Sequence, residues 1–166
     1  YATICTERGK KWEEVAESGD ERVITGQYRV SLDEKGRLLV PSRIRAAVPG
    51  NHLVITAGID RCLWLFPPEE WRGLSDRLME TASPFSKRAR LLQRRIIAPA
   101  QEIELDKSGR INIPQNLQQT ANLARECVLH GISRFIEIWD VQEYDAYLNE
   151  HESEFQEAAE ELGGSV

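Results

Sequence analysis

The sequence predicts a mainly β protein with flanking helices (α+β), in which two internal repeats form one small barrel. The first observation is a pattern, Leu-Asp-x-x-Gly-Arg-apolar-x-apolar-Pro, that occurs at residues 32–41 and again at 105–114, an offset of 73 residues. The second is that the same offset carries residues 58–66 onto 131–139, with Gly-Ile at the start of both. The third is that short alternating or apolar runs, separated by turn residues, recur in both halves, as in short strands. A pattern that occurs only twice, with a period above the roughly 20 to 50 residues of solenoid repeats, indicates two halves of one structure. A chain of short strands with small helices, built twice, suggests a small barrel in which two equivalent hairpins interleave.

Each repeat opens with a strand, a tight turn and a second strand. Polar and apolar residues alternate from 27 to 32, which is typical of a half-buried strand. Asp33 and Gly36 then hold the first and fourth positions of a type I turn, and Asp106 and Gly109 repeat this chemistry. Glycine tolerates the left-handed backbone conformation that tight turns use. The pattern therefore predicts a hairpin in each repeat.

A proline ends the second strand of each repeat, at Pro41 and at Pro114. Proline cannot donate a hydrogen bond to a strand ladder, but it suits the first turn of a helix. Short helices are therefore expected at 41–48 and 114–121, with further strands at 53–56, 62–66, 127–130 and 135–139.

Each repeat closes with a helix, and another helix links the two repeats. Acidic residues at 69–70 lie near the positive end of the first, and Asp140 with Glu143 resembles a capping box at the start of the second. The linking helix is expected to begin at Ser83-Pro84, with one face made of Phe85, Ala89, Leu92 and Ile96 and the other of Lys87, Arg90 and Arg94. The basic face is open to three interpretations: a solvated surface, a subunit contact or a phosphate contact.

These elements divide the chain into five segments. We expect an N-terminal extension that is mobile at 1–23, a first repeat at 24–80, the linking basic helix at 81–97, a second repeat at 98–145, and an acidic C-terminal helix and tail at 146–166. The net charge is -6, yet residues 22–99 hold 14 Lys/Arg against 7 Asp/Glu, while residues 100–166 hold 4 against 14. Such asymmetry indicates one surface that faces a polyanion, because steering depends on the local field; uneven charge arising by chance is the alternative.

The composition excludes several classes of protein. No run approaches the roughly 18 apolar residues that cross a bilayer, so a soluble, cytoplasmic protein without a membrane partner is expected. The three cysteines, Cys5, Cys62 and Cys127, form no metal-binding pair, and the last two stand in apolar runs that favour a core position. The three histidines lack metal-ligand spacing, and no nucleophile elbow or phosphate loop is present. We therefore expect no metal, no cofactor and no enzymatic activity.

The repeated pattern resembles the AbrB-like swapped-hairpin DNA-binding domains, in which two copies form one barrel. A tandem pair in one chain, with Gly-Gln-Tyr-Arg at 26–29 before the first turn and a helix around Trp71 after it, resembles the MraZ family over residues 24–160. The resemblance implies a sequence-specific transcriptional regulator of bacteria that binds repeated elements in the promoter of the division and cell-wall gene cluster. It further implies a ring-shaped homo-oligomer that is associated with the nucleoid.

The residues of the turn give this resemblance a physical meaning. Arginine can read guanine O6 and N7 with two hydrogen bonds, whereas lysine mainly binds phosphate. The alternative for Arg37 is a surface ion pair with Asp33, and both interpretations can hold if Asp33 orients the guanidinium. The expected DNA-binding residues are Arg37, Lys35, Arg29, Arg43, Arg45, Arg110 and Lys107; Asp33, Gly36, Pro41, Asp106, Gly109 and Pro114 are expected to form the structural motif.

The two repeats differ in these cations. Ser108 stands where the first repeat has Lys35, and Asn116 and Gln118 stand where it has Arg43 and Arg45. The hypothesis that follows is that the first repeat makes most DNA contacts and that the second mainly completes the barrel. Two alternatives remain open: Arg43 and Arg45 on a merely solvated helix, and an AbrB-fold, antitoxin-like module that binds a protein through its acidic C-terminal segment.

Overall fold

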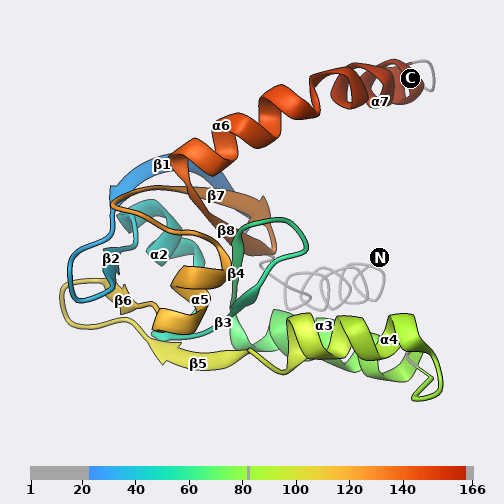
Figure 1. The fold of residues 1–166 in the computed structure, drawn as a ribbon. Helices are drawn as coiled ribbons and strands as arrows, with labels where there is room; N and C mark the ends of the chain where they lie inside the picture. The colour runs from blue at the N-terminus through green and yellow to red at the C-terminus, as the bar shows by residue number, and fades with distance from the viewer. Residues whose placement is uncertain (1–22, 82, 164–166) are drawn as a thin grey trace, which may run out of the picture.

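The computed structural model describes residues 23–81 and 83–163, and it shows a six-stranded antiparallel sheet next to a two-stranded one (Figure 1). The strands are β1 (Ile24–Ser31), β2 (Arg37–Leu39), β3 (His52–Ala57), β4 (Leu63–Phe66), β5 (Gln101–Glu104), β6 (Arg110–Asn112), β7 (Glu126–Ser133) and β8 (Phe135–Asp140). The larger sheet has the order β1-β7-β8-β4-β3-β5, and β2 pairs with β6. The predicted fold class, mainly β with flanking helices, is confirmed. The mobile extension expected at 1–23 lies, except for Val23, outside the described residues.

The two repeats exchange strands. β1 of the first repeat pairs with β7 of the second from Ile24↔Ser133 to Ser31↔Glu126. β5 of the second repeat pairs with β3 of the first, and the two short strands β2 and β6 pair with each other. The predicted interleaving is therefore confirmed. The hairpin expected within the first repeat is limited to its turn and one bridge, Leu32↔Leu38, because the strands beyond the turn find their partners in the other repeat.

The two-stranded sheet, which we call the ribbon (β2 with β6), lies between the edges of the larger sheet. Those edges are β1 and β5, so the larger sheet is open rather than closed by hydrogen bonds. β1 contacts β2, and β5 contacts β6. The ribbon thus covers the core where a closed barrel would have continuous strand pairing. Leu38 and Ile111 face each other at its centre, and both have 0% exposure.

The core is built from equivalent positions of the two repeats. The helices are α2 (Ser42–Ala47), α3 (Pro68–Thr81), α4 (Lys87–Leu92), η1 (Gln93–Ile97), α5 (Gln115–Thr120), α6 (Val141–Glu150) and α7 (Glu152–Gly163). Ile44 of α2 and Leu117 of α5, which are 73 positions apart, are both buried in the same cluster as Leu38 and Ile111. The short helices α2 and α5 directly follow Pro41 and Pro114, in agreement with the prediction that a helix starts at each of these prolines. Each repeat thus adds one short helix to a shared core.

The linking helix differs from its prediction at its start and on its apolar face. It begins at Lys87, because the Ser86 hydroxyl, and not that of Ser83, accepts a hydrogen bond from the Ala89 N–H at 3.3 Å. Phe85 therefore precedes the helix and is 93% exposed, and Leu92 is 44% exposed. After α4 the helix continues as the π-helix η1, in which the Ala98 N–H donates to the Gln93 carbonyl, five residues earlier, at 2.9 Å.

The C-terminal helices begin as predicted at Asp140, whose carboxylate accepts hydrogen bonds from the N–H groups of Gln142 and Glu143. In a complete capping box the Glu143 carboxylate would accept a hydrogen bond from the Asp140 N–H. In the structure it accepts one from Asn122 Nδ2 at 2.6 Å. α6 packs on Trp139 through Tyr144 and Tyr147, whereas every residue of α7 is exposed. The apolar side chains of Leu148 and Phe155 are exposed. Among the described residues, no helix has both the length and the apolar character to cross a bilayer.

Both described cysteines lie in the core, as predicted. Cys127 belongs to the main cluster, and Cys62 packs with Val128 and Trp139 in a smaller one. Burial raises the pKa of the Cys127 thiol to about 12, and it raises the pKa of the Cys62 thiol as well. A protonated thiol is a poor nucleophile and a poor metal ligand. Cys5 lies outside the described residues, within which no cluster of potential metal ligands occurs.

Candidate nucleic-acid interface

The two turns of the repeated pattern have the same backbone geometry. The Gly36 N–H donates to the Asp33 carbonyl at 3.0 Å, and the Gly109 N–H donates to that of Asp106 at 2.9 Å. Gly36 has a φ of 74° and Gly109 one of 79°. An L-residue in this left-handed region is strained, which explains glycine at both positions.

In each turn an aspartate orients the arginine four residues later. Asp33 Oδ1 accepts from the Lys35 N–H at 3.0 Å and from the Arg37 N–H at 2.8 Å, while Oδ2 lies 2.8 Å from Arg37 Nε. Asp106 repeats these contacts, with Oδ2 3.0 Å from Arg110 Nε. The hydrogen bond from the backbone N–H of the arginine, followed by that from its side chain, holds the pKa of each carboxyl below its ordinary value. Both aspartates are therefore ionised at neutral pH, and each accepts a hydrogen bond from Nε of the arginine in its own turn.

The ribbon presents both arginines on one outer face. Across it, Arg37 faces Asn112 and Arg110 faces Leu39, on either side of the buried pair at its centre. Directly opposed residues of antiparallel strands project to the same side, and alternate residues of one strand share a face. These four residues therefore form the outer face, where each arginine side chain is 35% exposed. Among the described residues, the aspartate of its own turn is the one ion-pair partner of each arginine.

Each turn is anchored by the other repeat. The Ile113 N–H donates to the Gly36 carbonyl at 2.8 Å, and the Val40 N–H donates to the Gly109 carbonyl at 3.0 Å. The side chain of Gln118, on α5, lies against Gly36, and the guanidinium of Arg45, on α2, lies against Gly109. Turn 1 (residues 33–36) thus packs beside α5, and turn 2 (residues 106–109) packs beside α2.

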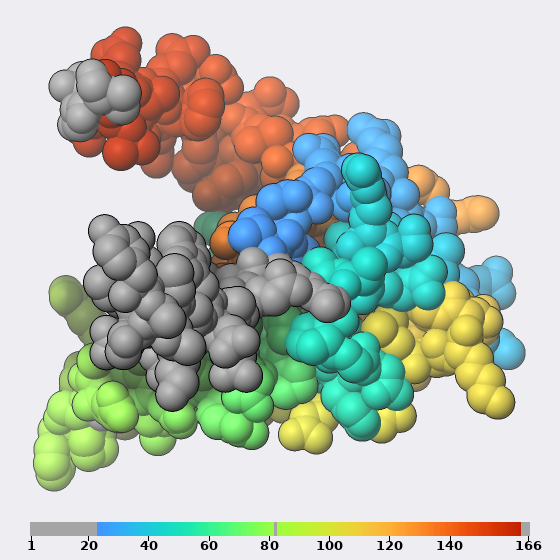
Figure 2. Space-filling view, turned by 180° about the vertical axis from the view of Figure 1, so that it is seen from behind, coloured from blue at the N-terminus to red at the C-terminus, as the bar shows by residue number. Residues whose placement is uncertain are grey.

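Two further cations of the first repeat line an open groove between β1 and α2. Arg29 and Arg43 lie on its two sides, and Leu39 of the ribbon forms part of its wall. Figure 2 shows the teal segment that contains α2 between the blue β1 and the yellow segment that contains turn 2. The equivalent positions of the second repeat hold Glu102 and Asn116. One side of the ribbon is therefore more basic than the other.

The strand exchange redistributes the cations that the sequence assigns to one repeat. Lys35 and Arg37 lie beside the uncharged helix α5, while the basic helix α2 lies beside turn 2 with Lys107 and Arg110. Sequence reasoning missed this separation, and it missed the anchoring role of position 118. One signal was present in the sequence: the equivalent positions 45 and 118 both hold a long side chain with hydrogen-bond donors. In the structure Arg45 and Gln118 donate to the carbonyl of the residue before the proline, at 3.0 and 2.7 Å.

Arg45 is consequently a packing residue as well as a cation. Its Nε donates to the Val40 carbonyl, and a β-carbon placed on Gly109 would lie 2.5 Å from its Nη1. Arg43, by contrast, is exposed on the first turn of α2. Of the two, Arg43 is better placed to reach a ligand outside the protein.

Comparisons with known proteins agree with the repeat structure. The family model described as "MraZ protein, putative antitoxin-like" matches residues 23–95 and again 96–164. The chain is 49% identical over 140 residues to the "Transcriptional regulator MraZ" of Treponema denticola, a match that covers 84% of this chain and 97% of the relative. It is 43% identical over 143 residues to the protein of the same description from Treponema pallidum, covering 86% and 96%. With a matching model in both repeats and relatives aligned over nearly their full length, the chain belongs to the MraZ family.

Proposed function

We propose that this protein is a sequence-specific transcriptional regulator that binds double-stranded promoter DNA through the outer face of the ribbon. The observation that carries the proposal is the pair of arginines, each oriented by an aspartate, on an exposed two-stranded ribbon. The major groove of DNA admits a two-stranded β-ribbon, and arginine is the commonest reader of guanine. The relatives described as transcriptional regulators support this assignment.

The basic residues around the ribbon suit phosphate contacts. Lys35 and Lys107 stand in the exposed turns, and Arg29 and Arg43 line the neighbouring groove. Contacts to phosphate fix the orientation of a protein on the duplex, while contacts to base edges give specificity. We assign the two ribbon arginines to base edges and the other four residues to phosphates.

The exchanged packing supports a different division of labour from that expected from the sequence. If the first repeat made most contacts, Arg110→Ala would cost less affinity than Arg37→Ala. In the structure Arg110 faces Leu39, which lines the groove of Arg29 and Arg43, whereas Arg37 faces Asn112. We therefore assign both arginines to DNA, with the more basic side next to Arg110.

A single ribbon offers few contacts, so its affinity for one site is expected to be modest. Binding of several linked subunits to repeated promoter elements would raise the effective local concentration without new contacts. This reasoning supports the ring-shaped homo-oligomer that the family resemblance implies. The same resemblance assigns the promoter of the division and cell-wall gene cluster as the target and the nucleoid as the location.

The test is a gel shift on the DNA upstream of the protein's own gene, at several salt concentrations. Arg37→Ala and Arg110→Ala should each weaken binding by about 1–3 kcal/mol, or about 5- to 150-fold. Arg72→Ala, on α3 and away from the ribbon, removes the same charge and should leave affinity nearly unchanged. Arg43→Ala should lower the slope of log affinity against log salt by about 1, whereas Asn116→Ala should not.

Two outcomes would contradict the proposal. One is the absence of any shift with the parent protein at low salt. The other is an equal loss of affinity for Arg37→Ala and Arg72→Ala, since that would indicate a general charge effect. The protein-binding, antitoxin-like module is the second candidate, favoured by the family description and by the exposed α7. It predicts that a partner protein binds normally to the Arg37→Ala variant.

A further inference from the structure

The helix α7 is an amphipathic helix whose large apolar side chains are exposed. All twelve of its residues, 152–163, are exposed. Phe155 and Leu162 are 68% and 73% exposed, and their spacing of seven residues, with Ala158 and Ala159 between them, places these four side chains on one stripe. Isolated helices of this length are marginal in water, so most of their stability comes from packing of the apolar face. The stripe is therefore suited to an apolar surface of another molecule.

The acidic charge of α7 limits what that surface can be. Its five glutamates are accompanied by no lysine or arginine: Glu152, Glu154, Glu157, Glu160 and Glu161. On helical geometry these residues flank the apolar stripe on both sides. A matching surface must combine an apolar centre with a basic rim.

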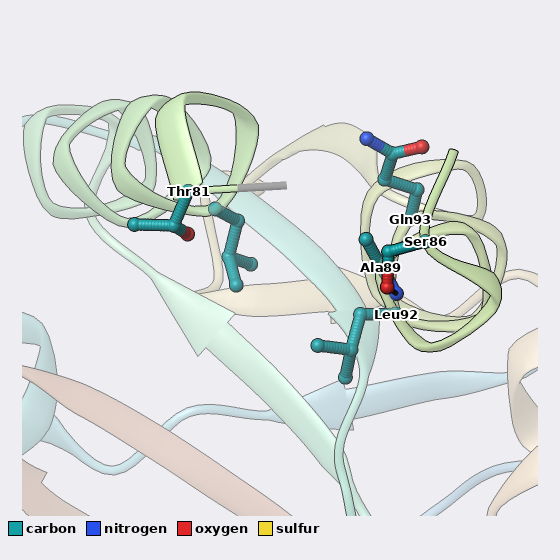
Figure 3. A pocket seen from close by; sticks show the side chains of 6 residues that line it. Thr81, Ser86, Ala89, Leu92 and Gln93 are labelled. Carbon is teal, nitrogen blue, oxygen red and sulfur yellow. Dashed lines mark hydrogen bonds between the residues drawn. The ribbon is translucent and has the colours of Figure 1, made fainter. Parts of the chain in front are cut away.

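The segment of α4 and η1 has this combination. Residues 83–99 hold five cations and no acid, and all five cations lie at 87–95. Leu91 and Leu92 are 47% and 44% exposed among them. Beside Leu92, a pocket opens between α3 and α4, lined by Leu78, Thr81, Ser86, Ala89, Leu92 and Gln93; Figure 3 shows Thr81 and Leu92 on opposite sides of this space.

The two surfaces do not meet within one chain. α7 extends from one side of the sheet, and α3 with α4 extends from the other, although both point toward the same end of the molecule (Figure 1). The complete exposure of α7 shows that α4 does not cover it. The same chain thus carries an acidic amphipathic helix and a basic apolar acceptor that remain apart.

We propose that α7 of one copy docks its Phe155–Leu162 stripe on the basic α4–η1 surface of a second copy, with one of these side chains entering the pocket beside Leu92. Donor and acceptor are different surfaces, so the contact is head-to-tail, and such contacts generate rings when their rotation closes. The inference rests on the homo-oligomer of the proposed function and names the surfaces that would form it. Charge complementarity, five acids against five cations, selects a second copy over an uncharged partner.

Charge reversal on each surface tests the contact, with molar mass measured by light scattering. Glu154→Lys with Glu160→Lys makes the donor basic, and Lys87→Glu with Arg94→Glu makes the acceptor acidic; all four residues are exposed. Each double variant alone should show a lower mass than the parent, because its surfaces now repel. An equimolar mixture should regain the parent's mass, because a basic donor then meets an acidic acceptor and the second junction is unaltered. Unchanged circular dichroism and Tm would show that the variants fold.

The outcomes separate this inference from the proposed function. An oligomeric parent whose mass neither double variant lowers would overturn the α7–α4 contact and leave the proposed oligomer intact. A monomeric parent at all concentrations would overturn both, while DNA binding would still be judged by the gel shift. Loss of assembly in both variants without recovery in the mixture would show that the two surfaces do not meet each other, and would also refute the contact.

Discussion

Alanine substitutions at three glycines with nearly the same φ allow the contribution of packing between the repeats to the free energy of unfolding to be measured. Gly36, Gly50 and Gly109 have φ values of 74°, 74° and 79°. A β-carbon added to Gly50 meets no atom within 4 Å, whereas one added to Gly36 meets the Gln118 amide, and one added to Gly109 meets the Arg45 guanidinium. Alanine at each position therefore imposes the same backbone strain, but only two positions also lose packing with the other repeat.

The expected magnitudes follow from these contacts. The left-handed conformation destabilises the folded state by about 1–2 kcal/mol when an L-residue replaces glycine. The same substitution lowers the conformational entropy of the unfolded chain, which offsets about 0.4–1 kcal/mol of that loss. Gly50→Ala should thus destabilise the fold by about 1 kcal/mol. In Gly36→Ala, Gln118 must also move and lose its 2.7 Å hydrogen bond to the Ile113 carbonyl, which adds about 1 kcal/mol. The variant should therefore lose about 2 kcal/mol, and Gly109→Ala should lose a similar amount through Arg45.

Urea unfolding at equilibrium measures these free energies, and a double-mutant cycle isolates the contact. Arg45→Ala removes the group that Gly109→Ala would displace, so the double variant should be less destabilised than the sum of the single variants. Equal losses for Gly50→Ala and Gly36→Ala, or strict additivity of Arg45→Ala with Gly109→Ala, would refute the conclusion that each turn is anchored by the helix of the other repeat.

Three further predictions concern the site and the core. Asp33→Asn should weaken DNA binding in the gel shift although it removes a negative charge, because it loosens the grip on Arg37; a gain in affinity would contradict the orienting role. Burial lowers the pKa of His130 below its ordinary 6.5, so its contribution to stability is present above pH 6.5 and is lost as the pH falls toward the folded-state pKa. The Tm of the parent should therefore fall more between pH 7.5 and about 5.5 than that of His130→Phe, and equal falls would contradict this reasoning. Cys62 and Cys127 should react with a thiol reagent only on unfolding, as mass spectrometry of the labelled protein can show, and fast labelling of either in the native state would refute their burial.

Local chemistry could be predicted from the sequence because it depends on neighbouring residues. Asp33 and Gly36 are sufficient to specify the turn, and Pro41 specifies the junction between strand and helix. The interleaving of the two repeats could also be predicted, but the partner of each strand could not, since an apolar alternation is satisfied equally by a strand of the same repeat or of the other. Only the tertiary structure shows that β1 pairs with β7 and not with β2. The grouping of cations depends on that choice, and for this reason the sequence assigned the basic surface to the first repeat, whereas in the structure α2 of the first repeat lies beside turn 2 of the second.

The start of the linking helix illustrates a second kind of limit. Ser83 and Ser86 are both acceptable N-cap residues, and Ser83 precedes a proline that suits a helix start. In the structure the Ser83 hydroxyl accepts from the Phe85 N–H, and its carbonyl accepts from the Ser86 N–H, which forms a turn before the helix. The Ser86 hydroxyl is therefore left to cap the helix, and Ala89 and Ile96 of the helix that follows are buried.

The arrangement of the two proposed surfaces has a consequence for regulation. The ribbon lies at one end of the molecule, and α4 and α7 extend from the other (Figure 1). Assembly through α7 and α4 would therefore leave the DNA-binding face of every subunit free, so that neighbouring ribbons could engage successive promoter elements. In that case the charge-reversal variants at Glu154 and Glu160 should keep the affinity of the parent for a duplex with one element and lose its advantage on a duplex with several. An equal loss on both duplexes would show that the two surfaces are not independent.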